Sequence, residues 1–561
     1  MKTMKNALAL LLVVLMLATA AAGCGGAANE PESTAATTAA TTAAQTDKAA
    51  TEPAAELEGT IVINPLANTP GLKEGWEAVA KGYMDIHPKV KITVDPKPQE
   101  SYGEWVKNEL NSEKPVADII SGNMAGSAKD GKVINWLEYI NNKSPYSDGV
   151  WKDQFNYDLQ QKNVAKQLLD TISLESVQVL WFYNKDMFSK ADVKAPTTWK
   201  ELVDVCGKLQ KAGIQPLAVP GDYQSFWAMQ LGWLAQIYAD QTSRSWINTT
   251  RAQDGDFCYD PDMDGVWKYN VNDPYNDDTW VVNQNELRFY NAMKDGTIKA
   301  DSEGMRTVMS SLKEVFPKYA GGDAFFGTKD PAHIQLFLQG KAAMLLNGGW
   351  FFTEFKRAMD SVASGKEITA GSGDAAVKVD GVQKFEMGSF NNPSMEGPGI
   401  EAPVRTIEVA VGFLSGVKKD KAHDDLVADF MMYYSSKEGY GKWMTAALNT
   451  GYNPAGPSLV YNVELPEEYA KLFAEVKFIG NGQKGYGNRL ARGTASNKGD
   501  IDPSYREWYK YTQDFLTGKI DVTQWAKLHQ ANHLKYLPEA MKNGGISEND
   551  LKNPQNAPTG K

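Results

Sequence analysis

The chain has 561 residues, a formal net charge of −11 and a pI near 5.2. Chains beyond roughly 250 to 300 residues divide into domains, so two lobes or more are expected. A hydrophobic share of 42% supports sizeable cores and excludes a disordered or fibrous protein. The acidic balance, without a basic stripe, excludes nucleic acid as a partner, because neutralising phosphates requires a basic surface.

The first residues have the pattern of an export signal. Lys2 and Lys5 precede an apolar run over residues 7–17, and small residues follow. This run is too short to cross a membrane, which takes about 20 residues. Residues 1–23 are therefore predicted to be a signal peptide.

Residues 21–24, Ala-Ala-Gly-Cys, resemble the bacterial lipobox, although Ala21 stands where Leu is usual. The resemblance implies acylation of Cys24 and anchoring of an exported protein to the outer face of the cell membrane. The alternative is ordinary signal cleavage nearby, with Cys24 incidental. Residues 24–58 are rich in Ala and Thr and contain few large apolar side chains, so they are predicted to be a flexible tether.

A β-α-β-α-β pattern follows the tether. Its expected elements are strand 60–66, a helix capped by Thr69 and Pro70, strand 90–94, a helix over 102–110 and strand 116–120. Such alternation predicts a mostly parallel sheet with helices on both faces, whose ligands bind beyond the carboxyl ends of the strands. Asn68, Tyr102 and Asn123 lie at or near those ends and are therefore candidate ligand contacts.

The stretch 171–200 joins a buried strand to a helix. Residues 177–183 form an apolar run long enough for a strand buried on both faces, and a helix begins at Trp199. Cys206 falls on the apolar face of that helix and is predicted to be a core residue rather than a reactive thiol. Whether it pairs with Cys258, in a polar loop, is left open.

Residues 241–285 are polar and acidic. Within them, Asp260, Asp262 and Asp264 fit the first half of a calcium-binding loop, because carboxylates at alternate positions converge on a hard cation. Val271 stands where such a loop needs its bidentate Glu. Two interpretations stay open, a calcium site or a solvated acidic loop.

The second half of the chain repeats the alternation. Residues 340–346 are predicted to form a strand, which Asn347 and two glycines follow before a helix opens at Trp350. The glycines would let a ligand approach the backbone, and the free amides of a helix N-terminus suit an oxygen-rich ligand. The remaining expected elements are loops or a hairpin over 361–399, one buried strand over 405–417, and helices over 424–434 and 437–448.

Several motifs occur in order along the chain. They are HPKVKI from His87, ADII from Ala117, YNKDMF from Tyr183, PTTWKEL from Pro196, FLQGKAAM from Phe337 and NGGW from Asn347. Together they resemble the extracellular solute-binding proteins of bacterial ABC importers, family 1, which includes maltose- and multiple-sugar-binding proteins. The resemblance extends over residues 60–537.

This resemblance implies a two-lobed α/β protein of the periplasmic-binding-protein type II fold. Each lobe would be a mixed, mostly parallel sheet flanked by helices, with a hinge between the lobes. The implied segments are 59–173 and 405–456 for the N-terminal lobe, 174–404 and 457–545 for the C-terminal lobe, and 546–561 for a C-terminal tail. The chain would cross between the lobes near Ser173, Arg405 and Gly456.

Sugars present apolar C–H faces and a rim of hydroxyls, so their sites need flat aromatic rings and planar polar side chains. The resemblance implies Trp350 as a stacking ring, Trp227 as a second ring and Glu175 as a polar contact on the interlobe strand. The other candidate contacts are Tyr102, Asn123, Asn68, Asn347, Tyr452 and Arg489. The alternatives are core positions for the tryptophans, a hinge surface for Glu175 and an exposed surface for Arg489, and Trp233 is expected in the core.

Enzymatic signals are weak. His529 and His533 have the spacing of a helical metal pair, but Gln530 replaces the Glu of the metalloprotease motif and no third ligand is evident. The expected function is that of a monomeric, non-enzymatic lipoprotein without a cofactor. It would capture a carbohydrate, with an oligosaccharide as the expected ligand, by hinge closure and deliver it to an ABC permease. The alternatives are an exported glycoside hydrolase or lyase and a surface polysaccharide-binding adhesin.

Overall fold

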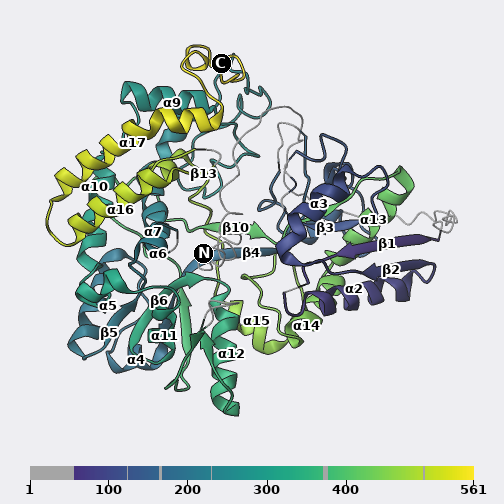
Figure 1. Ribbon diagram of the computed structural model, residues 1–561, viewed down its shortest axis with the longest axis horizontal. Helices are drawn as coiled ribbons and strands as arrows, with labels where there is room; N and C mark the ends of the chain where they lie inside the picture. The colour runs from purple at the N-terminus through teal and green to yellow at the C-terminus, as the bar shows by residue number, and fades with distance from the viewer. Residues whose placement is uncertain are drawn as a thin grey trace, which may run out of the picture.

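The computed structural model describes residues 56–67, 69–122, 124, 126–162, 167–228, 230–370, 377–496 and 499–561. The chain forms two lobes, each a sheet flanked by helices, and strands β4 (Glu175–Asn184) and β10 (Glu408–Val411) run between them (Figure 1). The two-lobed α/β architecture expected from the sequence is therefore confirmed.

The N-terminal lobe, called lobe 1 below, contains a sheet with the strand order β11-β3-β1-β2. β1 is parallel to β2 and β3, and β11 is antiparallel to β3. Its strands are β1 Gly59–Asn64, β2 Val90–Val94, β3 Ile119–Ser121 and β11 Leu414–Gly416, and its helices are α2 Leu72–Ile86, α3 Tyr102–Asn111, α13 Lys421–Tyr434 and α14 Lys437–Asn449.

Aromatic packing joins α2 to the two C-terminal helices of lobe 1. The ring centre of Trp76 lies 4.6 Å from that of Tyr434 and 6.2 Å from that of Trp443. Gly75 lets α2 approach α14, because a side chain there would meet the backbone oxygen of Trp443 at 3.0 Å. The apolar face of α2 is thus buried, which is where most of the stability of a helix in a protein comes from.

The start of α2 differs from the expectation. The helix begins after Gly71, whose φ of 79° places it in the left-handed region that glycine adopts at little cost. Thr69 and Pro70 lie in the turn before it, so the prediction that they cap the helix is wrong.

The C-terminal lobe, called lobe 2 below, contains a sheet with the strand order β10-β4-β6-β5, and β9 also pairs with β4. β5 and β6 are parallel, whereas β4 is antiparallel to β6, β9 and β10. β4 is buried along nearly its whole length, which confirms the strand predicted from the apolar run. The other strands are β5 Gln215–Ala218, β6 Ala342–Gly348 and β9 Met387–Phe390, and two short pairs are formed by β7 Thr369–Ala370 with β8 Val377–Lys378 and by β12 Ala495–Ser496 with β13 Gly499–Asp500.

Helices surround the lobe 2 sheet (Figure 1). α5 (Trp199–Lys211) begins at the predicted residue, because the Thr198 hydroxyl accepts a hydrogen bond from the Glu201 amide while the Glu201 carboxylate accepts one from the Thr198 amide. The other helices are α4 Lys185–Lys190, α6 Tyr223–Ala228, α7 Gln230–Asp240, α8 Ile247–Thr250, α9 Glu286–Asp295, α10 Glu303–Val315, α11 Ala332–Leu338, α12 Phe351–Ser364, α15 Glu467–Phe473, α16 Asp502–Leu516 and α17 Val522–Gly544.

Short 3₁₀ turns connect several of these elements in both lobes. They are η1 Gln99–Ser101, η2 Trp136–Glu138, η3 Trp151–Gln154, η4 Arg244–Trp246, η5 Gly322–Gly327, η7 Tyr486–Leu490 and η8 Asp550–Lys552.

Residues 405–417 form two strands in different sheets, so the prediction of a single strand is wrong. β10 pairs with β4, and β11 pairs with β3 of lobe 1. Between them Gly412 has a φ of 72°, a conformation that cannot continue a strand. The chain therefore passes from one lobe to the other at this glycine.

The other two passages between lobes lie before β4 and around α15. Ile172 bridges Leu414 of lobe 1, and three residues later Glu175 pairs with Val411. After α14, Val460 is still buried in the lobe 1 core, whereas the later residues Leu472 and Phe473 pack against a core cluster of lobe 2. The change of lobe thus follows Gly456, where the sequence places it, by several residues.

Residues 546–561, expected as a tail, pack against lobe 2. Ile546 and Leu551 are buried in a cluster with side chains of α9 and α17. The carbonyl of Pro554 accepts a hydrogen bond from the Asn285 side chain at 3.1 Å. The C-terminus lies beside these helices at the end of lobe 2 (Figure 1).

The acidic segment 241–285 is attached to lobe 2 through Arg405, which is 1% exposed. The guanidinium of Arg405 donates to both carboxylate oxygens of Asp240 and to both of Asp277. A buried guanidinium needs such planar, two-sided pairing to offset its desolvation. Arg405 lies just before β10. It therefore fixes the acidic segment to α7 and to the start of β10.

Candidate functional site

Glu175, the first residue of β4, lies where the strand passes between the lobes. Its Oε1 accepts a hydrogen bond of 2.6 Å from the Tyr452 hydroxyl, and its Oε2 accepts one of 3.3 Å from the Ala455 amide. Burial raises the pKa of Glu175 to about 7, and the two hydrogen bonds lower it in part. At neutral pH this carboxyl group is therefore poised between its protonated and charged forms.

Tyr452 connects Glu175 to lobe 1. Its ring lies edge-on to Trp443 of α14, with 5.2 Å between ring centres. A side chain at Gly71, before α2, would meet the Cβ of Tyr452 at 2.8 Å. Burial and the charge of Glu175 raise the pKa of the Tyr452 hydroxyl, which keeps it a hydrogen-bond donor. Two predicted contacts, Glu175 and Tyr452, are thus brought together.

Trp350 lies on the lobe 2 side, at the N-terminus of α12. Its half-buried ring packs edge-on to Trp233, with 6.1 Å between ring centres. Trp233 is 4% exposed, which confirms its predicted place in the core. Trp350 therefore contacts a core residue with its ring while the residue as a whole stays partly exposed.

The two glycines before Trp350 serve the protein itself. A Cβ at Gly348 would lie 2.1 Å from the Trp350 ring, and one at Gly349 would lie 2.7 Å from the backbone oxygen of Ala455. The indole and the 455–456 backbone occupy the space where a Cβ would stand, so the protein's own packing requires these glycines, and the approach of a ligand to their backbone stays a prediction. The glycines place Trp350 next to the segment that binds Glu175.

Asn347 is buried in β6 opposite Leu180, and its Oδ1 accepts a hydrogen bond of 2.8 Å from the Gly348 amide. It therefore shapes the strand end that carries Trp350.

Gln178 is a polar side chain that the sequence analysis passed over inside the apolar β4. It is fully buried, its amide nitrogen donates to Ser176, and its carbonyl oxygen Oε1 has no hydrogen-bond partner among the described residues. A Cβ at Gly456 would lie 3.2 Å from this Oε1. Gln178 pairs with Glu408 of β10 and therefore points to the face opposite Glu175. A buried amide in a run of apolar residues was the available signal for a polar contact there, because buried polar groups are usually hydrogen-bonded.

Tyr102 and Arg489 are engaged elsewhere. The Tyr102 hydroxyl donates to the carbonyl of Asn64 at 2.6 Å and accepts from the Ser121 amide at 2.8 Å, so it joins the ends of β1 and β3. Arg489 is ion-paired with Glu286 and stacks over Tyr486, at 4.8 Å from the ring centre. Neither side chain lies with the group formed by Glu175, Tyr452 and Trp350.

Some predicted positions lie outside the described residues. These are Asn68, Asn123 and the lipidation candidate Cys24. Trp227 belongs to α6, but its side chain also lies outside the described part of the chain.

A family model for bacterial extracellular solute-binding proteins matches residues 67–441, more than half of the chain. The protein belongs to this family. No curated protein sequence matches the chain significantly.

Solved structures share the fold of this solute-binding protein at low sequence identity. The apo form of RafE from Streptococcus pneumoniae has a TM-score of 0.54 and 15% identity, over 86% of this chain and 98% of RafE. The bacterial solute receptor AcbH has a TM-score of 0.51 and 13% identity, over 86% of this chain and 98% of AcbH. In the described part of the solute-binding protein, no helix is both long and apolar enough to span a membrane.

In the solute-binding protein's acidic segment, two of the carboxylates considered for calcium bond to the loop itself. Asp264 accepts hydrogen bonds from the backbone and side chain of Asn283 at 2.7 and 2.9 Å, and Asp260 accepts one from the Asp262 amide at 2.9 Å. These carboxylates cap the loop's own amides. Among the described residues, no group of three or more His, Cys, Asp or Glu side chains is placed to hold a metal ion.

The histidine pair on α17 is also structural. His529 is buried between the Tyr511 hydroxyl and the Leu490 carbonyl, each at 2.8 Å, and burial lowers its pKa to about 4. His533 is fully buried beside it, with ring centres 4.7 Å apart. Cys206 and Cys258 are both free and buried, which confirms Cys206 as a core residue.

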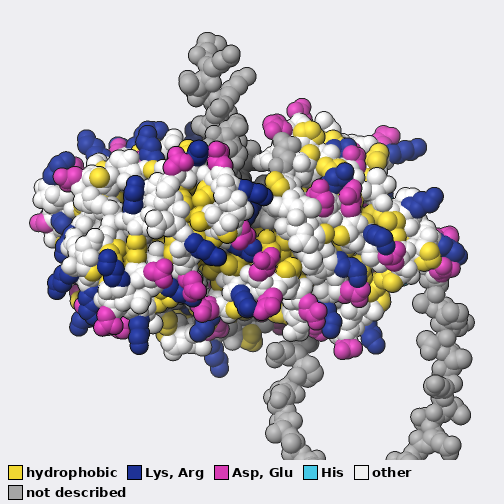
Figure 2. Space-filling model, turned by 90° about the horizontal axis from the view of Figure 1, so that it is seen from below, with side chains coloured by type: hydrophobic (Ala, Val, Ile, Leu, Met, Phe, Trp, Pro, Cys, Tyr) yellow, Lys and Arg dark blue, Asp and Glu magenta, His cyan; other side chains and the backbone are white. Residues whose placement is uncertain are grey.

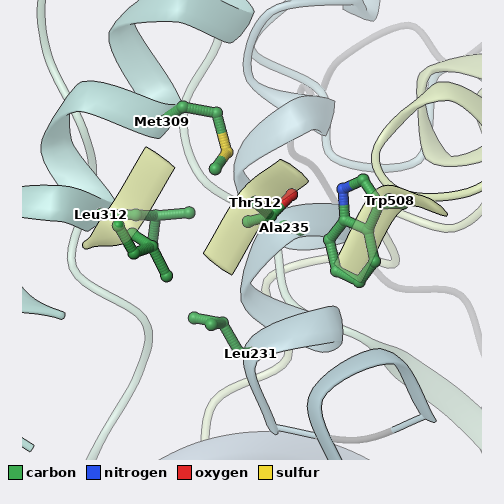
Figure 3. A pocket seen from close by; sticks show the side chains of 7 residues that line it. Leu231, Ala235, Met309, Leu312, Trp508 and Thr512 are labelled. Carbon is green, nitrogen blue, oxygen red and sulfur yellow. The ribbon is translucent and has the colours of Figure 1, made fainter. Parts of the chain in front are cut away.

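Two small cavities lie within lobe 2 of this solute-binding protein. One, of about 10 Å³, is enclosed by α7, α10 and α16, and its lining is almost wholly apolar (Figure 3). The other, of similar volume, lies beside His533. Each has room for about one water molecule, so neither holds a sugar.

Acidic and basic side chains are interspersed over both lobes on the face seen in Figure 2. No single sign of charge dominates that face.

Proposed function

We propose that this protein is the lipid-anchored substrate-binding component of an ABC importer and that it captures a carbohydrate between its lobes. The observation that carries the proposal is that the backbone at residues 455–456 joins the Glu175–Tyr452 pair to the turn before Trp350: the Ala455 amide bonds to Glu175, and the Ala455 carbonyl would lie 2.7 Å from a Cβ at Gly349. These residues come from the passage into β4, from the segment after α14 and from the end of β6. Elements of both lobes therefore meet at one site.

The chemistry of this group suits a sugar. A half-exposed indole offers a flat surface to the apolar C–H face of a pyranose. The buried Glu175 carboxyl, which binds the Tyr452 hydroxyl and the Ala455 amide, fixes the segment next to that ring. AcbH has an exclusive preference for β-D-galactopyranose, and RafE has been solved in complex with raffinose, which supports a carbohydrate as the ligand class.

Hinge closure would follow from ligand contacts on both lobes. The passages at Glu175 and Gly412 are single segments of backbone, which can absorb a rotation between two rigid cores. A sugar that touches both lobes binds the closed form more tightly and therefore increases its population. The closed form would then be the one that the permease recognises.

The test is a thermal-shift screen of the purified protein against mono- and oligosaccharides, with chemical analysis of the sugar afterwards. One or a few sugars are expected to raise the melting temperature and to be recovered unchanged. Cleavage of a glycan would instead favour an exported hydrolase or lyase.

Trp350→Ala is expected to remove the stabilisation by sugar while the unliganded protein keeps its fold. Trp267→Ala is a suitable control, since Trp267 lies in the acidic segment and bonds to Asn276 there. Full sugar binding by the Trp350 variant would contradict the proposed site.

Anchoring is tested separately. Cys24→Ser removes the residue proposed to carry the acyl chains. The variant should therefore move from the membrane fraction to the soluble fraction, because stable anchoring needs more than one such chain. Retention of the variant on membranes would contradict the lipid anchor without affecting the proposal on sugar binding.

A further inference from the structure

The acidic segment 241–285 contacts, through Tyr275, the face of the β4–β10 ribbon that is opposite to Glu175. Glu175 pairs with Val411 and Gln178 with Glu408, so Glu175 and Glu408 point to opposite faces. The Tyr275 hydroxyl donates to Glu408 at 3.2 Å. The segment therefore lies behind the hinge, as seen from the proposed sugar site.

This segment moves with lobe 2. Asp277 is held by Arg405, and the backbone oxygen of Asp273 accepts from the buried Arg244 at 2.9 Å. The Gln284 side chain donates to the backbone of Asp277 and, at 3.3 Å, to that of Lys484. Trp280, inside this network, is thus attached to the lobe 2 body.

Lys162 reaches the same tryptophan from lobe 1. It follows Phe155, which is buried in the lobe 1 core, and its Nζ donates to the carbonyl of Tyr157 at 2.9 Å. Its Nζ lies 3.9 Å from the ring centre of Tyr157 and 4.4 Å from that of Trp280. Only 3% of the Lys162 side chain is exposed, and its Nζ also pairs with the Asp158 carboxylate of the same lobe at 3.7 Å, so this cation is largely desolvated between that carboxylate and the two rings.

Lys484 provides an internal comparison. Its Nζ lies 5.2 Å from the same Trp280 ring. It belongs to lobe 2, because the neighbouring Gly482 amide bonds to Thr406 at 2.8 Å, beside β10. Trp280 therefore has one lysine from each lobe, and only the contact with Lys162 spans the hinge.

We infer that Lys162 and Trp280 form a latch behind the hinge that opposes closure of the cleft. Rotation about the β4–β10 ribbon that brings the lobes together on the Glu175 face separates them on the opposite face, where the latch lies. Closure must therefore pull the Lys162 ammonium away from the Trp280 ring. This inference rests on the hinge closure in the proposed function. The latch would raise the free-energy cost of closure and so lower the apparent affinity for the ligand.

The test measures the distance between the lobes without any ligand. Cysteines are introduced at the exposed positions Lys107 on α3 and Lys211 on α5, in a Cys24→Ser background, and carry the spin labels. The distance between the two labels is measured by pulsed electron paramagnetic resonance. Lys162→Met removes the charge but keeps an apolar stem. The ratio of short to long distances is expected to rise roughly fivefold or more, as for loss of a desolvated cation–π contact.

Lys484→Met is the matched control and should leave the distance distribution unchanged. Trp280→Leu should reproduce the effect of Lys162→Met, and thermal unfolding checks that each variant is folded. A distribution for Lys162→Met and Trp280→Leu that equals that of the unsubstituted protein would overturn the latch. Because no sugar is present, a failure of sugar binding does not affect this result. If a binding sugar is found, Lys162→Met should bind it more tightly by a similar factor.

Discussion

The Tyr452 hydroxyl donates a 2.6 Å hydrogen bond to Glu175, although the two residues are separated by almost half of the chain. Glu175 begins the strand that enters lobe 2, and Tyr452 packs on α14 of lobe 1. A buried carboxyl group is costly unless its oxygens are bonded, so this pair fixes the relation between two of the segments that pass near the hinge.

Glu175→Gln should change how stability depends on pH. The folded state raises the pKa of Glu175 from its usual 4.5 to about 7, so the folded protein binds this proton more tightly than the unfolded chain does. Below pH 4.5 Glu175 is protonated in the folded and the unfolded chain, and the protein has its full stability with respect to this group. As the pH rises from 4.5 through 7, the unfolded chain loses the proton first, so the free energy of unfolding falls. Glutamine cannot lose a proton, so the unfolding free energy of the variant, minus that of the unsubstituted protein, should rise by up to about 3 kcal/mol between pH 4.5 and 8.

Urea denaturation at a series of pH values measures this difference. Glu408 and Asp278 also have pKa values raised to about 7 by burial, but they are present in both proteins and cancel in the subtraction. A difference that stays constant over this range would show that Glu175 is charged and well solvated.

Tyr452→Phe should destabilise the protein mainly at alkaline pH. The variant leaves the charged carboxylate without its strongest donor, at a cost of about 1 to 3 kcal/mol at pH 8. The cost should be smaller at pH 5, where Glu175 is protonated. Tyr461→Phe is a matched control, because Tyr461 is 50% exposed and should change little at either pH. Equal losses at both pH values would mean that the hydroxyl acts independently of the carboxyl charge.

The sequence predicted most elements because their signals are local. The capping box at Thr198 and Glu201 starts α5, and the apolar run of β4 is long enough to specify a buried strand. The division of residues 405–417 at Gly412 could not be predicted, because both halves are apolar and only the pairing partners separate them. Likewise, the contact between Glu175 and Tyr452 is a matter of tertiary distance, which no spacing along the chain encodes.

Arg405→Met should be strongly destabilising. The substitution leaves the carboxylates of Asp240 and Asp277 buried without their shared cation, and breaking such an arrangement costs about 3 to 5 kcal/mol. Urea denaturation monitored by circular dichroism measures the loss. Arg506→Met, which removes an exposed pair with Asp502 at 2.7 Å, should have little effect. Similar losses in the two variants would contradict the importance given to the buried group.

Gly348→Ala should weaken sugar binding without a change in any group that touches the sugar. The added methyl would lie 2.1 Å from the Trp350 ring, so the indole must leave its position against Trp233. Displacement of a stacking ring by about 1 Å is enough to lose much of its contribution, and a reduction in affinity of roughly tenfold or more is expected. Gly103→Ala is the control, because a Cβ there has no neighbour within 4 Å and a helix favours alanine. Isothermal titration with a sugar found in the thermal-shift screen gives both affinities. If Gly348→Ala binds as tightly as Gly103→Ala, the position of the Trp350 ring does not govern binding, and the platform must be sought in another side chain.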